Sequence, residues 1–226
     1  MMATTHALFG VALAAATLAV APEFGTAALV ASVAGSVFPD LDLYAGHRRT
    51  LHYPVYFSAA ALPAVAVAAF APRPATVALA CFLVGAAAHS LSDVLGGGLE
   101  LKPWRATSER AVYDHFRGRW LGPRRWIRYD GAPEDLLVAV ALGAPAFAVY
   151  DRPVQVFVAA VLAVSTAYVL ARKSLAGLAE RLVPLVPRAL RGHLPERFRA
   201  AADPASSGEA VAPSGTATAS ASEADD

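Results

Sequence analysis

Residues 75–95 read ATVALACFLVGAAAHSLSDVL, an apolar run whose acidic and basic side chains are confined to His89 and Asp93 near its end. A transmembrane helix needs roughly 20 mostly apolar residues, so this run predicts one. His89 and Asp93 are four residues apart and therefore share one helix face. Ionisable side chains are costly within hydrocarbon and are kept there when they are paired or coordinated. The pair indicates a functional site, and a plain buried His–Asp hydrogen bond is the alternative.

The composition of the whole chain is typical of a membrane protein. Of the 226 residues, 56% are apolar and only 16% are charged, and the mean hydropathy is +0.45. Soluble domains carry about 25% charged residues. The net charge of +1 gives no reason to expect a nucleic-acid partner. The single cysteine, Cys81, cannot form an intrachain disulfide and is interpreted as a small core residue.

Six apolar stretches are separated by polar connections. They cover about 5–21, 24–38, 53–71, 75–95, 135–150 and 154–171. The third, fourth and sixth are long enough to cross a bilayer, whereas the others are short. We therefore expect an all-α fold, a polytopic transmembrane helical bundle of about six apolar helices within a range of four to six. No Lys or Arg precedes the first stretch, so we interpret it as a retained helix rather than a signal peptide.

The basic residues predict the orientation of the bundle. If all six stretches span, the N-terminus, residues 39–52, residues 96–134 and everything after 171 lie on one side. Of the 19 Lys and Arg residues, all but Arg73 and Arg152 fall in those segments. Cytoplasmic loops carry the excess of Lys and Arg. We expect a multi-pass protein of the plasma or inner membrane with both termini cytoplasmic.

Composition also divides the chain into three parts. Residues 1–173 are the predicted membrane-embedded domain, with a cytoplasmic Arg- and Trp-rich loop at 96–134. Residues 174–200 combine regularly spaced Leu with several Arg, which predicts an amphipathic helix on the membrane surface, broken at Pro184 and Pro187. Residues 201–226 are rich in Ala, Ser and acids, which predicts a disordered tail.

Further candidate metal ligands lie at the same predicted end of the bundle as His89 and Asp93. They open the first stretch, close the second and precede the third, and they are His6, Asp40, Asp42, His47 and His52. Histidine combined with carboxylate suits zinc or another first-row divalent ion. We predict that one or two divalent ions, with zinc expected, are bound by His6, Asp40, His52, His89 and Asp93. Asp42 or His47 would be a further ligand or a catalytic proton acceptor.

Each residue alone also has an ordinary interpretation. His6 could be an interfacial or capping group, and Asp40 and Asp42 could simply end a helix. His47 could belong to a basic loop. The joint occurrence of these residues at one end is what favours a site.

These residues also carry a resemblance to a known family. Thr5-His6, Pro39-Asp40-Leu41-Asp42, the segment His47-Arg48-Arg49-Thr50-Leu51-His52, His89-Ser90-Leu91-Ser92-Asp93 and Pro103-Trp104 occur in that order. This pattern over about residues 1–105 resembles the inner-membrane metal-dependent hydrolases. It is more distantly similar to the all-α zinc-dependent phospholipase C and single-strand nuclease fold. The resemblance implies a polytopic helical protein with hydrolase activity, and the distant one implies phosphoester substrates.

The loop 96–134 has two interpretations. It begins with three glycines and holds every Trp of the chain, Trp104, Trp120 and Trp126, which are typical of a membrane–water interface. Alternatively it forms a lid over the site, with arginines that bind an anionic head group. The candidate substrate-binding residues are Arg48, Arg49, Arg124 and Arg125.

The expected function is a membrane-bound metal-dependent hydrolase. Its substrate would be a phosphoester or other anionic ester, either a small molecule or a lipid, reached at the cytoplasmic face of the bilayer. The main alternative is a non-catalytic membrane protein with a structural metal or polar packing site. A transporter is a third class, but it would place polar groups near the midplane and show two matching halves. An oligomeric state does not follow from the sequence.

Overall fold

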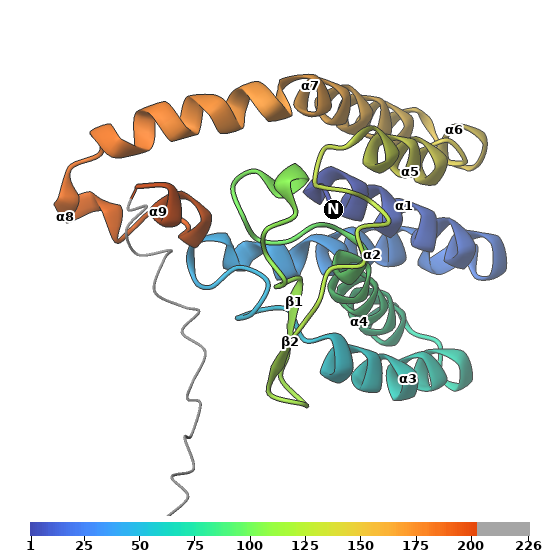
Figure 1. Ribbon diagram of the computed structural model, residues 1–226. Helices are drawn as coiled ribbons and strands as arrows, with labels where there is room; N and C mark the ends of the chain where they lie inside the picture. Colours follow the sequence, from blue (N-terminus) through green and yellow to red (C-terminus); the bar gives the residue numbers. More distant parts are fainter. Residues whose placement is uncertain (203–226) are drawn as a thin grey trace, which may run out of the picture.

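The computed structural model describes residues 1–202, so the tail predicted from 201 onward lies almost wholly outside the described residues. Six helices lie side by side in the order α7 (Arg152–Leu182), α5 (Pro133–Gly143), α1 (Ala3–Val20), α2 (Gly25–Val37), α4 (Pro74–Ser92) and α3 (Pro54–Phe70) (Figure 1). Neighbours in this layer are often far apart in sequence. Because α2 packs between α1 and α4, the start of α1 lies near the ends of α2 and α4.

Four segments are long and apolar enough to cross a membrane. They are Ala3–Val20, Pro22–Tyr44, Pro74–Leu95 and Arg152–Leu185. The second combines α2 with the 3-10 turns η1 (Pro22–Phe24) and η2 (Phe38–Tyr44), and the third adds η3 (Asp93–Leu95) to α4. The fold is mostly helical and these four segments could span a membrane, but the count of six spans is not confirmed. The apolar α3 is shorter, with 17 residues.

The predicted span at 135–150 is broken in the structure. Residues 133–143 form α5, and after a turn the four-residue α6 (Ala146–Val149) follows. The 11 residues of α5 extend over only about 16 Å at 1.5 Å per residue, against a hydrocarbon core of about 30 Å. This stretch therefore packs against α1 and α7 without the length of a separate span.

Prolines mark where several helices begin. Pro54, Pro74, Pro133 and Pro153 stand at the first or second position of α3, α4, α5 and α7. Proline suits this position because its fixed φ is helical and its missing N–H would have no partner there. These breaks separate apolar runs that would otherwise merge.

Small residues let α2 approach its two neighbours closely. A Cβ atom added at Gly10 of α1 would lie 2.6 Å from Val33 Cα, and one at Gly85 of α4 would lie 2.8 Å from Ser32 O. Ser32 also donates a hydrogen bond from its hydroxyl to the Gly10 carbonyl, at 2.7 Å. Close packing of this kind drives helix association in lipid. It holds the ends of α1, α2 and α4 in register.

The segment 96–134, predicted as a loop, contains regular secondary structure. Because it includes a β-hairpin, the described chain is not purely helical as the sequence predicted. It contains the 3-10 turn η4 (Pro103–Arg105) and an antiparallel hairpin of β1 (Val112–Asp114) and β2 (Arg119–Leu121), which pairs Tyr113 with Trp120. Backbone hydrogen bonds tie it to η3, which follows α4, for example from Arg124 N–H to Val94 O at 2.8 Å. Strands of three residues are too short to leave a periodic pattern in a sequence.

The C-terminal segment begins as one helix. α7 runs without a break through the boundary predicted at 173, and it ends at Leu182, just before Pro184. The turn η5 (Val183–Leu185) and the short helices α8 (Arg188–Arg191) and α9 (Glu196–Ala202) follow. Figure 1 shows that α9 folds back toward the end of the layer that carries the hairpin. This return places α9 near the residues predicted as ligands.

Candidate metal centre

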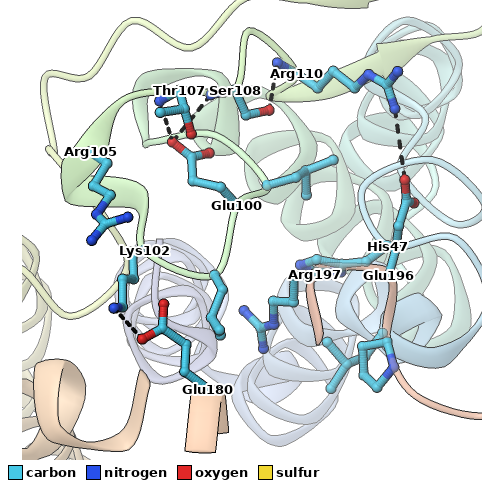
Figure 2. Close-up of a pocket in the computed structure, with 14 residues that line it drawn as sticks. His47, Glu100, Lys102, Arg105, Thr107, Ser108, Arg110, Glu180, Glu196 and Arg197 are labelled. Carbon is cyan, nitrogen blue, oxygen red and sulfur yellow. Dashed lines mark hydrogen bonds and ion pairs between the residues drawn. The ribbon is translucent and has the colours of Figure 1, made fainter. Parts of the chain in front are cut away.

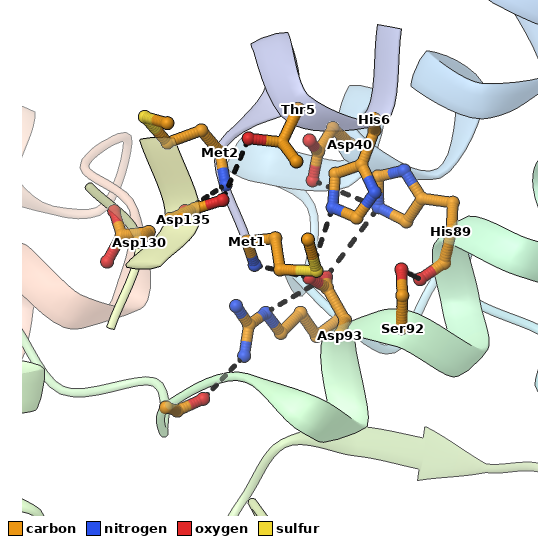
Figure 3. Close-up of polar contacts among 12 residues, drawn as sticks. Met1, Met2, Thr5, His6, Asp40, His89, Ser92, Asp93, Asp130 and Asp135 are labelled. Carbon is orange, nitrogen blue, oxygen red and sulfur yellow. Dashed lines mark hydrogen bonds and ion pairs between the residues drawn. The ribbon is translucent and has the colours of Figure 1, made fainter. Parts of the chain in front are cut away.

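The predicted ligands converge at one end of the helical layer. His6 lies in the second turn of α1, Asp40 in η2, His52 just before α3, His89 in the last turn of α4 and Asp93 at the start of η3. Figure 3 shows His6, Asp40, His89 and Asp93 directed toward one another. The clustering predicted from topology alone is therefore present in the structure.

Four of these residues form a group that could hold one metal ion. Asp40, His52, His89 and Asp93 each offer a ligand atom, and these atoms lie within 4.8 Å of one another. Asp93 Oδ2 is 3.4 Å from His52 Nε2 and 3.6 Å from His89 Nε2. His89 Nε2 also lies 3.5 Å from Asp40 Oδ1. Three of the four side chains are fully buried, whereas Asp40 is 21% exposed.

In His52 and His89, the hydrogen bond made by Nδ1 determines whether Nε2 can accept a hydrogen bond or bind a metal ion. His89 Nδ1 lies 2.6 Å from the Ser36 carbonyl oxygen, which can only accept, so this nitrogen carries a proton. His52 Nδ1 lies 3.0 Å from Asp42 Oδ2 and donates in the same way. In a neutral histidine the other nitrogen then holds a lone pair. Both Nε2 atoms are buried without a hydrogen-bond partner among the described residues, and both face carboxylate oxygens.

Lone pairs facing lone pairs repel, so with neutral imidazoles this arrangement is unfavourable unless a cation lies between them, whereas protonated imidazoles would form ion pairs with Asp40 and Asp93. Histidines that bind metals usually donate their second N–H to a carboxylate or a backbone carbonyl, as His52 and His89 do here. The donor set of two imidazoles and two carboxylates matches the preference of first-row divalent ions. These residues therefore fit a metal ion.

Asp42 lies outside the four-residue group. Its buried carboxylate accepts N–H groups from His47, Arg48, Leu51 and His52 at 2.9–3.3 Å. In this arrangement Asp42 positions His52, while its predicted role as a further ligand or proton acceptor stays a prediction.

His47 lies at the edge of the site. Its Nδ1 donates to Asp42 Oδ1 at 2.9 Å, and its side chain is 19% exposed. Burial lowers the pKa of His47 below its usual value, and the positive charge of Arg48 adds to this, although the Asp42 hydrogen bond opposes it. His47 therefore presents a free Nε2 at the rim rather than a buried ligand atom.

His6 contacts the group without belonging to it. Its ring stacks on His89 with centroids 3.7 Å apart, and its Nε2 lies 3.2 Å from Asp93 Oδ1. The carboxylate can only accept, so His6 is the donor in this bond. In this arrangement His6 supports Asp93 and His89, while its predicted role as a direct ligand stays a prediction.

Two cationic groups of the chain also lie within ion-pair distance of Asp93. The amine of Met1 lies 2.6 Å from its Oδ1, and Arg48 Nε lies 3.3 Å from its Oδ2, within ion-pair distance although without hydrogen-bond geometry. Arg48 further donates to the Gly97 carbonyl at 2.8 Å and is almost completely buried. Arg48 thus pairs with the site and joins it to the segment after α4.

The other predicted substrate-binding arginines are placed differently. Arg49 lies over the ring of Tyr113, with 4.7 Å between the guanidinium carbon and the ring centroid. Arg125 pairs with Glu109 at 2.8 Å, and Arg124 is exposed. None of the three lines the cavity beside Asp40, whereas Arg48 and Arg197 do. Arg197 lay within the predicted surface helix, and no local motif marked it as part of the site.

Comparison of this chain with known protein families, with curated proteins and with solved structures finds no match.

Proposed function

We propose that the protein is a membrane-bound, metal-dependent hydrolase whose ion is held by Asp40, His52, His89 and Asp93. The observation that carries the proposal is the pair of buried Nε2 atoms of His52 and His89, which face carboxylates and have no hydrogen-bond partner in the described part of the chain. Zinc is the expected metal because imidazole and carboxylate together suit it. The ordered motifs over residues 1–105, which resemble the inner-membrane metal-dependent hydrolases, support the same reaction class.

A divalent ion at this position would supply Lewis acidity and lower the pKa of a water molecule toward about 7. The chain itself contributes a proton acceptor. His47 donates from Nδ1 to Asp42, so its Nε2 carries the lone pair, and the side chain lines the cavity that Asp40 also lines. A histidine oriented by a carboxylate in this way suits general-base catalysis. We assign His47 this role, with Asp42 as the residue that orients it.

The substrate proposed is a phosphoester or another anionic ester that approaches at the end of the bundle where the termini of α1 and α4 meet. Arg48 adds positive charge beside Asp93 there. The distribution of Lys and Arg supports a cytoplasmic position for this end, in a plasma or inner membrane.

A structural role is the competing proposal, and one observation favours it. Asp93 already pairs with Arg48 and with the Met1 amine, so part of its charge is balanced without an ion. A buried network of this kind can fix helix packing without catalysis. It requires protons on both Nε2 atoms, whereas a metal ion accounts for both with neutral imidazoles, which is why we prefer the hydrolase.

The test combines metal analysis with turnover on purified protein. Wild-type protein should carry metal and hydrolyse an aryl phosphate, and His89→Ala and Asp93→Ala should lose both. His115→Ala is the matched control, since His115 is half-buried and contacts only the Arg49 carbonyl among hydrogen-bond partners in residues 1–202. Metal without turnover on any ester would favour a structural metal site, and absence of metal would reject the hydrolase and leave an ion-free polar network.

A further inference from the structure

A cavity of about 410 Å³ begins beside Asp40 and extends to the C-terminal segment. A second cavity, of about 450 Å³, adjoins it, because both are lined by Leu43, His47, Leu99, Glu100 and Arg197. The first reaches Asp40 and Arg48, and the second reaches Lys102, Arg105 and Arg110. Together the two cavities extend from Asp40, one of the four candidate ligands, to Lys102, Arg105 and Arg110.

Arg197 is the cation that the two cavities share. It projects from α9, and Figure 2 shows it without a polar contact, whereas Lys102 pairs with Glu180 and Arg110 with Glu196. Its Nε is buried and has no hydrogen-bond partner within residues 1–202. Asp130 lines the same cavity and is paired with Arg172 at 3.0 Å, and Arg197 contributes to lowering the pKa of Asp130 as well. Arg197 as a whole is half-buried, but no described residue accepts a hydrogen bond from its buried Nε, and an anionic group of a ligand would accept it.

Glu100 lines both cavities as well, but its charge is largely engaged. Its Oε1 accepts the backbone N–H groups of Thr107 and Ser108 at 2.9 and 3.3 Å. Its Oε2 is buried and unpartnered, so it can accept a hydrogen bond from a hydroxyl or ammonium group of a ligand. The cavity thus offers a cationic donor and a separate acceptor.

Most of the remaining wall near Asp40 is apolar. Its apolar residues include Met2, Val37, Leu41, Leu43, Leu99 and Val164, and Thr4 and Tyr168 add polar groups. Leu41 is 68% exposed and lies next to Asp40 in η2, at the end of a segment apolar enough to span a membrane. Burying this apolar surface against the hydrocarbon part of a ligand would stabilise the complex. A small phosphate without a hydrocarbon part would leave the surface exposed to water.

We propose that this cavity binds an anionic amphiphile, whose anionic group contacts Arg197 and whose hydrocarbon part lies against Leu41, Leu43 and Val164. Arg197 is then a substrate-binding residue supplied by the C-terminal helix. The inference deepens the proposed function, since the amphiphile would be the ester presented to the metal centre.

Binding to the full-length chain, stripped of metal by a chelator and kept in a neutral detergent, tests this directly. Octyl phosphate and methyl phosphate share a head group and differ only in the chain. Octyl phosphate should bind at least about tenfold more tightly, because each buried CH₂ contributes about 0.8 kcal/mol. Arg197→Gln should weaken octyl phosphate binding about tenfold or more, as expected when a charge-assisted hydrogen bond is lost.

Arg199→Gln is the matched control, because Arg199 lies on the same helix and is exposed. Partition of octyl phosphate into detergent is the same for both variants, so their difference reports the cavity. Arg197→Lys keeps the charge and should retain part of the affinity, and melting curves show whether each variant is folded.

Equal binding of the two phosphates would reject the amphiphile and leave a soluble ester. Equal effects of the two glutamine variants would reject the role of Arg197. Neither result depends on metal or turnover, so failure here is distinguishable from failure of the proposed hydrolase.

Discussion

Replacing Asp42 by asparagine should weaken metal binding although Asp42 is not one of the four grouped ligands. Its Oδ2 accepts from His52 Nδ1 at 3.0 Å and from Leu51 N at 3.1 Å. Its Oδ1 accepts from His47 Nδ1 at 2.9 Å and from Arg48 N at 3.3 Å. An amide supplies only one oxygen, so two of these four donors would meet an NH₂ group in either orientation.

The consequence for the metal follows from the tautomer of His52. If the NH₂ group faces His52, its Nδ1 must accept, and the proton moves to Nε2, the atom that lies 3.4 Å from Asp93 Oδ2. A protonated Nε2 cannot bind an ion. If the NH₂ group faces His47 instead, the loop that carries His52 loses two hydrogen bonds. Changes to such outer partners cost about 10- to 100-fold in metal affinity, which corresponds to about 1.4–2.7 kcal/mol.

The assay is a zinc titration of metal-free protein against a chelating indicator of known affinity. Asp114→Asn is the matched control, because Asp114 is equally buried and accepts bonds from Phe116 and Arg117 in the β1–β2 turn, away from the metal group. That variant should lower thermal stability and leave the zinc affinity within about twofold of wild type. Wild-type zinc affinity in Asp42→Asn, or an equal loss in Asp114→Asn, would refute the positioning role of Asp42.

Three further results are expected. Gly85→Ala should destabilise the protein by about 1–3 kcal/mol through overpacking against α2. Gly177→Ala is the control, because an added Cβ there meets nothing within 4 Å, and it should leave the melting temperature equal or raised. A lower melting temperature for Gly177→Ala than for Gly85→Ala would contradict the close approach of α2 and α4. The hydrogen bond from Arg128 lowers the pKa of Glu134 from its usual 4.5 to about 2. The stabilising contribution of Glu134 is therefore complete above pH 4.5 and lost as the pH falls toward 2. Glu134→Gln should melt below wild type at neutral pH, with a difference that shrinks on acidification, and a constant difference would count against the pair. Restoring zinc at 100 times its dissociation constant should stabilise chelator-treated protein by about 2.7 kcal/mol, and an unchanged melting curve would argue against a folded-state metal site.

Much of the candidate site could be predicted because its signals are local. A His and an Asp four residues apart at the end of an apolar helix are visible in the chain, and so are the ends of the neighbouring apolar runs that carry His6, Asp40 and His52. The hydropathy of the helices and the Lys and Arg content of the loops predict that these helix ends lie on the same side of the membrane, without knowledge of packing. Less could be predicted of the fold between helices, where a hairpin with three-residue strands has no periodic pattern.

The sequence by itself determined that this chain is mostly helical, rich in segments able to cross a membrane, and polar at one end of them. Only the tertiary structure decided that Asp40 faces the imidazole nitrogens while Asp42 holds His52 from behind, since two carboxylates two residues apart in a 3-10 turn point in different directions. It also brought Arg197 to a cavity beside Asp40. Spacing along the chain cannot report such contacts, because they depend on how closely α1, α2 and α4 pack and on where the chain returns after α7. Packing, rather than pattern, selects which polar groups face the ion position.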